Sequence, residues 1–78
     1  MLEKTIVLKD FNSVKEFVEI ANSEPYDIEL MYGKYTVNAK SIMGVFSLDL
    51  TKPVVCVAHC DTPGEFLRKV RKFIYEGK

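Results

Sequence analysis

The residues best suited to chemistry in this sequence are two cysteines and the only histidine, which lie together in the run VVCVAHC at 54–60. Thiolates and imidazoles are zinc ligands, and two neighbouring thiols can form a disulfide. The β-branched residues of this run predict a strand, in which positions four apart are separated by about 13 Å. Cys56 and Cys60 are then too far apart to share a metal or a disulfide, and His59 points to the opposite face. We therefore expect free, buried thiols, with no metal site and no cofactor.

Ser41 is a second candidate for chemistry, because it opens the apolar segment VNAKSIMGVFSLDL at 37–50. Its hydroxyl has the position of a helix N-cap, where it accepts a hydrogen bond from a free amide of the first turn. The predicted helix is short, about two turns, and ends near Asp49 or Leu50. So short a helix cannot bury every apolar side chain, and we expect some of them to face solvent as a binding surface. The alternative is that all of them pack beneath neighbouring loops. The side chains concerned are Ile42, Val45, Phe46, Leu48 and Leu50.

The composition is that of one globular domain, which we assign to residues 1–78. Apolar residues make up 47% of the chain and charged residues 28%, which is too apolar for a disordered protein. Eleven basic and eleven acidic residues cancel, so net charge gives no attraction to nucleic acid or to a membrane surface. No apolar run approaches the roughly 20 residues of a membrane span, and the N-terminus lacks a signal-peptide core. These features predict a cytoplasmic protein, with a monomer as the favoured state.

The first half of the chain reads as a strand, a helix and a hairpin. Ser13 and Glu16 have the spacing of a capping box, in which each side chain bonds the other's backbone amide at the start of a helix. Apolar residues then recur at helical spacing, and the flanking segments alternate as strands do. The predicted elements are a strand over Glu3–Lys9, a helix from Ser13 to Asn22 with Val14, Phe17, Val18 and Ala21 as its apolar stripe, and strands over Asp27–Tyr32 and Tyr35–Val37 around a Gly33-Lys34 turn.

The second half contributes the short helix after Ser41, the strand at 54–60 and a final helix. Thr62 and Glu65 form a second predicted capping box, with Pro63 at the first helical position. The order β-α-β-β-α-β-α predicts an α+β fold, in which three helices cover one face of a four-stranded antiparallel sheet. The final helix has Phe66, Leu67, Val70, Phe73 and Ile74 as its apolar stripe, Arg68, Lys69, Arg71 and Lys72 as a predicted solvated face, and Gly77 as its predicted terminator.

The segment at 37–50 resembles the regulatory-serine segment of HPr, the histidine-containing phosphocarrier of the bacterial phosphoenolpyruvate-dependent sugar phosphotransferase system. The element order is similar as well, and the resemblance extends from Lys4-Thr5 to the last helix. It implies the HPr-like open-faced sandwich, with Ser41 as a regulatory phosphosite for HPr kinase/phosphorylase. It also implies protein partners, either phosphotransferase-system components or transcriptional regulators. The residues that would contact them are Lys40, Ile42, Met43, Phe46 and Leu48.

The sequence departs from the HPr family between the first strand and the first helix. The family has a Gly-[Leu/Ile]-His-Ala-Arg-Pro motif there, and its histidine carries the phosphate. This chain reads KDFNSV at 9–14, with no histidine, arginine or proline, and is similar in this respect to the catabolite-repression paralogue of HPr. We therefore expect a non-catalytic regulatory or adaptor protein rather than an enzyme. Two alternatives stay open: a phosphocarrier that uses a non-standard residue such as Asp10 or His59, and a relative that retains the fold with no phosphotransfer role.

Overall fold

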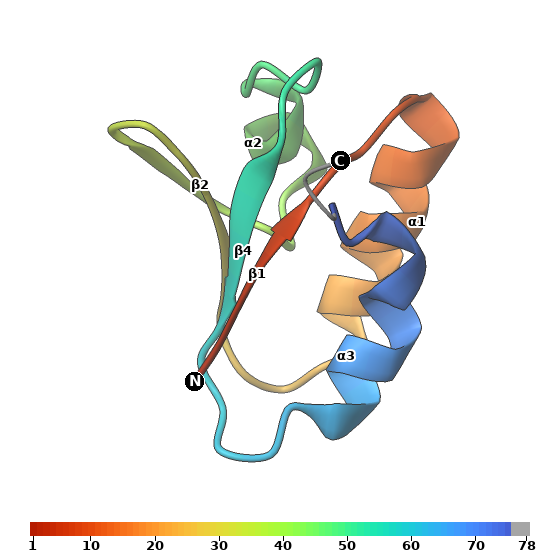
Figure 1. The fold of residues 1–78 in the computed structure, drawn as a ribbon, viewed down its shortest axis with the longest axis vertical. Coiled ribbons are helices and arrows are strands. Elements are labelled where there is room, and N and C mark those ends of the chain that lie inside the picture. Colours follow the sequence, from red (N-terminus) through yellow and green to blue (C-terminus); the bar gives the residue numbers. More distant parts are fainter. Residues whose placement is uncertain (76–78) are drawn as a thin grey trace.

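Four antiparallel strands form one sheet, and three helices lie on one of its faces (Figure 1). The computed structural model describes residues 1–75. The strand order in the sheet is β1-β4-β2-β3. The predicted α+β fold and the predicted element order are therefore confirmed. The elements are β1 (Leu2–Ile6), α1 (Phe11–Asn22), β2 (Ile28–Tyr32), β3 (Tyr35–Asn38), α2 (Ile42–Phe46), β4 (Val54–Ala58), α3 (Gly64–Val70) and the 3₁₀ turn η1 (Arg71–Phe73).

Alternation along the strands gives the sheet one covered face and one open face. Cys56 lies opposite Leu30 in the register of β4 and β2, and both side chains are buried beneath the helices. One residue further along, Val57 lies opposite Glu29 on the other face, because successive side chains of a strand point in opposite directions. Glu29 and Glu3, which both lie opposite Val57, thus mark the open side of the sandwich.

An aromatic cluster centred on Phe17 fills the space between the helices and the sheet. Phe17 of α1 has no exposed surface. Its ring meets Phe66 of α3 edge-on at 6.4 Å and Phe73 of η1 at 5.9 Å between centroids. The apolar stripe predicted for the first helix supplies this core, but the predicted final helix ends at Val70, so that its predicted stripe contributes Phe66 and Val70 from α3 and Phe73 from η1, while Leu67 is outside the core. The core also receives Ile6, Leu8, Val14, Val18, Ala21, Ile28, Leu30, Val45 and Val54.

The start of α1 differs from the prediction, because the N-cap is Asp10 and not Ser13. Asp10 has extended backbone, and its carboxylate accepts a hydrogen bond from the Ser13 amide at 2.8 Å. Aspartate caps helices as well as serine does, and a cap at Asp10 adds almost a full turn to the helix. Hydrogen bonds from the Ser13 amide and hydroxyl hold the pKa of the Asp10 carboxyl below its ordinary value, so this cap is anionic at neutral pH.

The predicted capping box at the start of α3 is also wrong. The helix begins at Gly64, and no side chain caps it. The Pro63 carbonyl accepts the Leu67 amide at 2.8 Å instead. Glu65 is hydrogen-bonded to Arg68 rather than to the backbone of Thr62, and this partner lowers the pKa of the Glu65 carboxyl. The predicted terminator Gly77 lies outside the described residues.

The basic face of the last helix is paired with acidic residues and is not simply solvated. Lys69 reaches Glu24 at 3.3 Å, and Lys72 contacts Glu16, so both join the C-terminal helical segment to α1 or to the residues just after it. An exposed pair such as Lys72 with Glu16 contributes no more than about 1 kcal/mol, whereas the pair of Lys69 with Glu24 is partly buried. The pairs therefore orient α3 and η1 more than they stabilise the domain. No helix in residues 1–75 has the length and apolarity that a membrane span requires.

We predict that Phe17→Leu lowers the free energy of unfolding by about 1 to 2 kcal/mol, because it removes two edge-to-face aromatic contacts and leaves a small cavity. Tyr35→Leu is the control, since the Tyr35 side chain is 69% exposed. Its effect should stay within about 0.5 kcal/mol. Urea unfolding followed by circular dichroism measures both. Equal losses in the two variants would contradict the central position of Phe17.

Cys56 gives a prediction for alkaline pH. Burial raises the pKa of the Cys56 thiol from 9.0 to about 12, so the folded protein retains a proton that the unfolded chain releases in this range. The stability that this thiol contributes is complete below about pH 9 and is lost as pH rises toward 12, by at most about 1.4 kcal/mol per pH unit. We expect the free energy of unfolding to fall more steeply with pH in the wild type than in Cys56→Ala. Parallel slopes would show that the thiol is not buried as described.

Candidate functional site

The short helix α2 is set by hydrogen bonds of two serines. Ser41 is the N-cap, as predicted, and its hydroxyl oxygen accepts the Gly44 amide at 3.2 Å. The helix ends at Phe46, earlier than the predicted end near Asp49 or Leu50. The Ser47 hydroxyl donates to the Gly44 carbonyl at 2.6 Å, while the Asp49 carboxylate accepts the amide and hydroxyl of Thr51 in a turn. These three local bonds compete with continuation of the helix.

The shortness of α2 decides which of its apolar residues reach solvent. Met43 is 77% exposed, Phe46 40% and Ile42 37%. Val45 points into the core, and Leu48 is only 8% exposed. Leu48 was predicted as a partner contact, but it packs beneath the surface because it follows the last turn of α2 and turns inward.

Phe11 extends this exposed surface from α2 onto the start of α1. Its ring stacks on Phe46 with 5.4 Å between centroids and 12° between planes. The Lys15 ammonium lies 5.9 Å from the centre of the Phe11 ring. We call Phe11, Ile42, Met43 and Phe46 the apolar patch. Sequence reasoning missed Phe11, although a large aromatic residue outside the apolar stripe of a helix was a signal that it faces something other than the core.

Lys40 joins the start of α2 to the end of α1 and does not extend freely into solvent. Its ammonium donates to the Glu24 carbonyl at 2.8 Å, and its own carbonyl accepts the side-chain amide of Asn22 at 3.0 Å. The lysine would have to leave Glu24 to pair with a phosphate on Ser41.

A shallow hollow of about 210 Å³ lies next to the apolar patch, between the start of α1 and the segment after α2. Asp10 lines it as an anionic cap of α1 whose carboxylate already accepts the Ser13 amide. The hollow is also lined by Leu8, Lys9, Val14, Phe46, Leu50 and Thr51. It contains neither a histidine nor an arginine.

His59 and the cysteines lie away from the apolar patch. His59 follows the end of β4 that is farthest from α2 (Figure 1). Its Nε2 is 2.9 Å from the Glu29 carboxylate on the open face of the sheet. Cys56 is buried, Cys60 is half-buried, and both thiols are free. Residues 1–75 contain no group of three histidine, cysteine or acidic side chains that could hold a metal ion.

Comparison with known proteins identifies the relatives of this fold. The family model described as the PTS HPr component phosphorylation site matches residues 12–74. No curated protein sequence matches the chain significantly.

Solved structures agree with the family match. HPr-C-His from Thermoanaerobacter tengcongensis has 30% sequence identity and a TM-score of 0.79, and the alignment covers 95% of this chain and 91% of that one. HPr from Bacillus anthracis has 24% identity and a TM-score of 0.72, with 95% and 96% of the two chains covered. The histidine-containing phosphocarrier of a Mycoplasma has 13% identity and a TM-score of 0.74, with 91% and 89% covered. The last two structures show only that the fold is shared. The family model and the first structure also show similarity of sequence, and this chain therefore belongs to the HPr family of the phosphotransferase system.

Proposed function

We propose that this protein is a regulatory or adaptor member of the HPr family, which binds other proteins through the apolar patch and does not itself carry phosphate between enzymes. The observation that carries this proposal is the stacked pair of Phe11 and Phe46, which presents aromatic surface at the junction of α1 and α2. Its candidate partners are phosphotransferase-system components, HPr kinase/phosphorylase and transcriptional regulators.

The apolar patch has the properties of a protein-binding surface. Aromatic and methionine side chains are enriched at protein interfaces, and a few such anchors supply most of the binding energy. Here the two rings already stack on each other, so little side-chain freedom is lost when a partner covers them. Met43, which is the most exposed apolar residue of α2, adapts its flexible side chain to the surface that it meets.

Ser41 is the candidate switch for this surface. Ser41 is exposed, and its hydroxyl lies at the first turn of the helix that carries Met43 and Phe46. A phosphate there adds about −1.5 to −2 charges next to the apolar patch. The free amides of the first turn favour that charge by about 0.3 to 2 kcal/mol. The fold therefore changes little, while the surface presented to a partner changes from apolar to strongly anionic.

Asp10 and His59, the residues that could carry phosphate in place of the family's histidine, are poorly placed for that role. Imidazole forms a phosphoramidate that transfers readily, and the segment 9–14 contains no histidine. Asp10 lies there, but its carboxylate is occupied as the cap of α1. His59 is hydrogen-bonded to Glu29 at the other end of the sheet. These placements support an adaptor over a carrier.

We predict that HPr kinase/phosphorylase with ATP adds one phosphate to the wild-type protein, at Ser41, and none to Ser41→Ala. Ser47→Ala is the matched control, because Ser47 belongs to the same short helix but donates its hydroxyl to the Gly44 carbonyl. Intact-mass and peptide mass spectrometry measure the modification. A wild-type protein that stays unmodified would contradict the assignment of Ser41. An acid-labile phosphate acquired from phosphoenolpyruvate and Enzyme I would contradict the adaptor role.

The apolar patch gives a second prediction. Phe46→Ala and Phe11→Ala should each weaken binding to Enzyme I or to HPr kinase/phosphorylase by about tenfold or more, because each removes an aromatic anchor. Met31→Ala is the control, since Met31 is an exposed apolar residue on the open face of the sheet. It should leave the Kd unchanged in isothermal titration calorimetry. An equal loss of affinity in all three variants would mean that the partner does not bind through the apolar patch.

A further inference from the structure

We propose that the free edge of β3 is a docking site for an extended segment of a partner protein whose side chains alternate between apolar and basic. The site consists of an unpaired strand edge with a hollow on each of its two faces. It lies apart from the apolar patch and does not depend on the function proposed for it.

The backbone of β3 has hydrogen-bonding groups that face outward. Ala39 donates its amide to the Ile28 carbonyl at 2.9 Å, and the register then places the bonded pairs of β2 and β3 at every second residue. Thr36 falls between two bonded pairs, so its N–H and C=O point away from β2. The amide of Asn38 points the same way, whereas its carbonyl accepts the Ser41 amide at 3.0 Å. Outside the sheet ladder, no backbone bond of Thr36 occurs within residues 1–75.

The two edge strands of the sheet differ in whether another segment of the chain bonds to them. The edge of β1 is covered by the chain itself, because Val7 donates to the Phe73 carbonyl and Tyr75 donates to the Thr5 carbonyl, each at 2.8 Å. The described residues provide no such cover for β3. Its sequence, YTVN, also lacks the lysine or proline that commonly protects an exposed edge. An uncovered edge of high strand propensity is suited to pairing with another strand.

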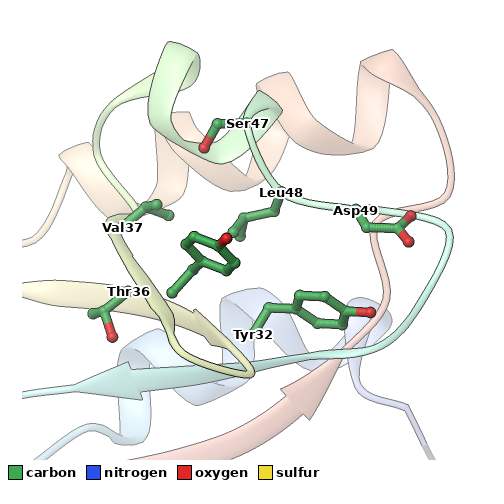
Figure 2. A pocket seen from close by; sticks show the side chains of 7 residues that line it. Tyr32, Thr36, Val37, Ser47, Leu48 and Asp49 are labelled. Carbon is green, nitrogen blue, oxygen red and sulfur yellow. The ribbon is translucent and has the colours of Figure 1, made fainter.

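On the helix side of the edge lies a cavity of about 440 Å³ (Figure 2). Val37 and Tyr32 come from the hairpin and Leu48 from the segment after α2, and these apolar groups form much of its lining. Ser47 and Asp49 stand at its border. The volume is within the range of sites that bind small molecules or single side chains. An apolar side chain next to the edge strand fits this cavity.

On the open side of the same edge lies a second hollow of about 190 Å³, and it is acidic. Asp27 and Glu29 line it together with Thr36 and Asn38 of β3. The Glu29 carboxylate already contacts His59 Nε2 through Oε1, so its second oxygen and the Asp27 carboxylate are the groups that attract a lysine or arginine side chain of a partner. The two faces of β3 therefore select opposite kinds of side chain.

An added strand meets both hollows because of its own alternation. Its residue opposite Thr36 points to the open side, toward Glu29, while the residues before and after it point to the helix side, toward Val37 and Leu48. Backbone bonds to Thr36 fix the register, and the two hollows select a basic residue flanked by apolar ones. The edge is four residues long, so the added strand is short.

The test uses the full 15N-labelled chain and the capped pentapeptide Lys-Leu-Lys-Leu-Lys. We expect chemical-shift changes confined to β3, Ser47–Asp49 and Asp27–Glu29, and about tenfold slower amide exchange at Thr36. Thr36→Pro removes the outward N–H and should abolish binding, while Thr36→Val keeps that N–H and should bind as the wild type does. If Thr36→Pro does not fold, the reciprocal bond of the same residue pair, from the peptide N–H to the Thr36 carbonyl, is tested with a peptide that is N-methylated at its central lysine.

Charge is tested separately. Glu29→Gln should weaken binding about three- to tenfold, and Glu3→Gln, the same change on the opposite edge strand β1, should not. The peptide Glu-Leu-Glu-Leu-Glu should not bind. Equal binding of both peptides, unchanged exchange at Thr36, or shifts confined to the apolar patch would each overturn the proposal. Slower exchange at Thr36 with rising protein concentration and no peptide would also overturn it, in favour of a second copy of this chain.

Discussion

The edge-to-face contacts of Phe17 are the packing interaction on which the rest of the structure depends. This one ring on α1 touches aromatic rings from α3 and from η1, so it joins α1 to the continuous C-terminal helical segment over the same face of the sheet. A domain of this size buries a small core, so each contact of this kind is a large part of its packing. The ion pairs of Lys69 with Glu24 and of Lys72 with Glu16 add orientation at the border of this core.

The candidate site follows from the position that this core gives to α1. With α1 fixed over the sheet, its first turn reaches α2, and Phe11 meets Phe46. The cap at Asp10 makes that contact possible, because a helix that began at Ser13 would leave Phe11 in a loop. A cap, which is a local bond between one carboxylate and one amide, thus determines whether the apolar patch includes one aromatic ring or two.

Residue periodicity predicted the elements well, because burial imposes it. The stripe of Val14, Phe17, Val18 and Ala21 is buried as a set, and the element order was sufficient to predict the sheet. Local hydrogen bonds were harder to predict. Asp10 and Ser13 are both good caps, and only the surrounding packing selects between them. Burial in and just after the short helix was also hard to predict, because the sequence alone does not show that Leu48 turns inward while Met43 faces solvent. Phe11 was missed because its partner is distant in the sequence.

The early end of α2 connects the two surfaces of this protein. A helix that continued from Phe46 to Leu50 would be about 6 Å longer. Ser47, Leu48 and Asp49, which now line the cavity beside β3, would then belong to the added turn. Ser47 prevents this by donating its hydroxyl back to the Gly44 carbonyl, and the chain then turns at Asp49. Phe46 is consequently left at a helix end, where it stacks on Phe11, and Leu48 and Asp49 are left to line the cavity. The same few hydrogen bonds therefore shape the apolar patch on one side of α2 and the cavity next to the free edge of β3 on the other.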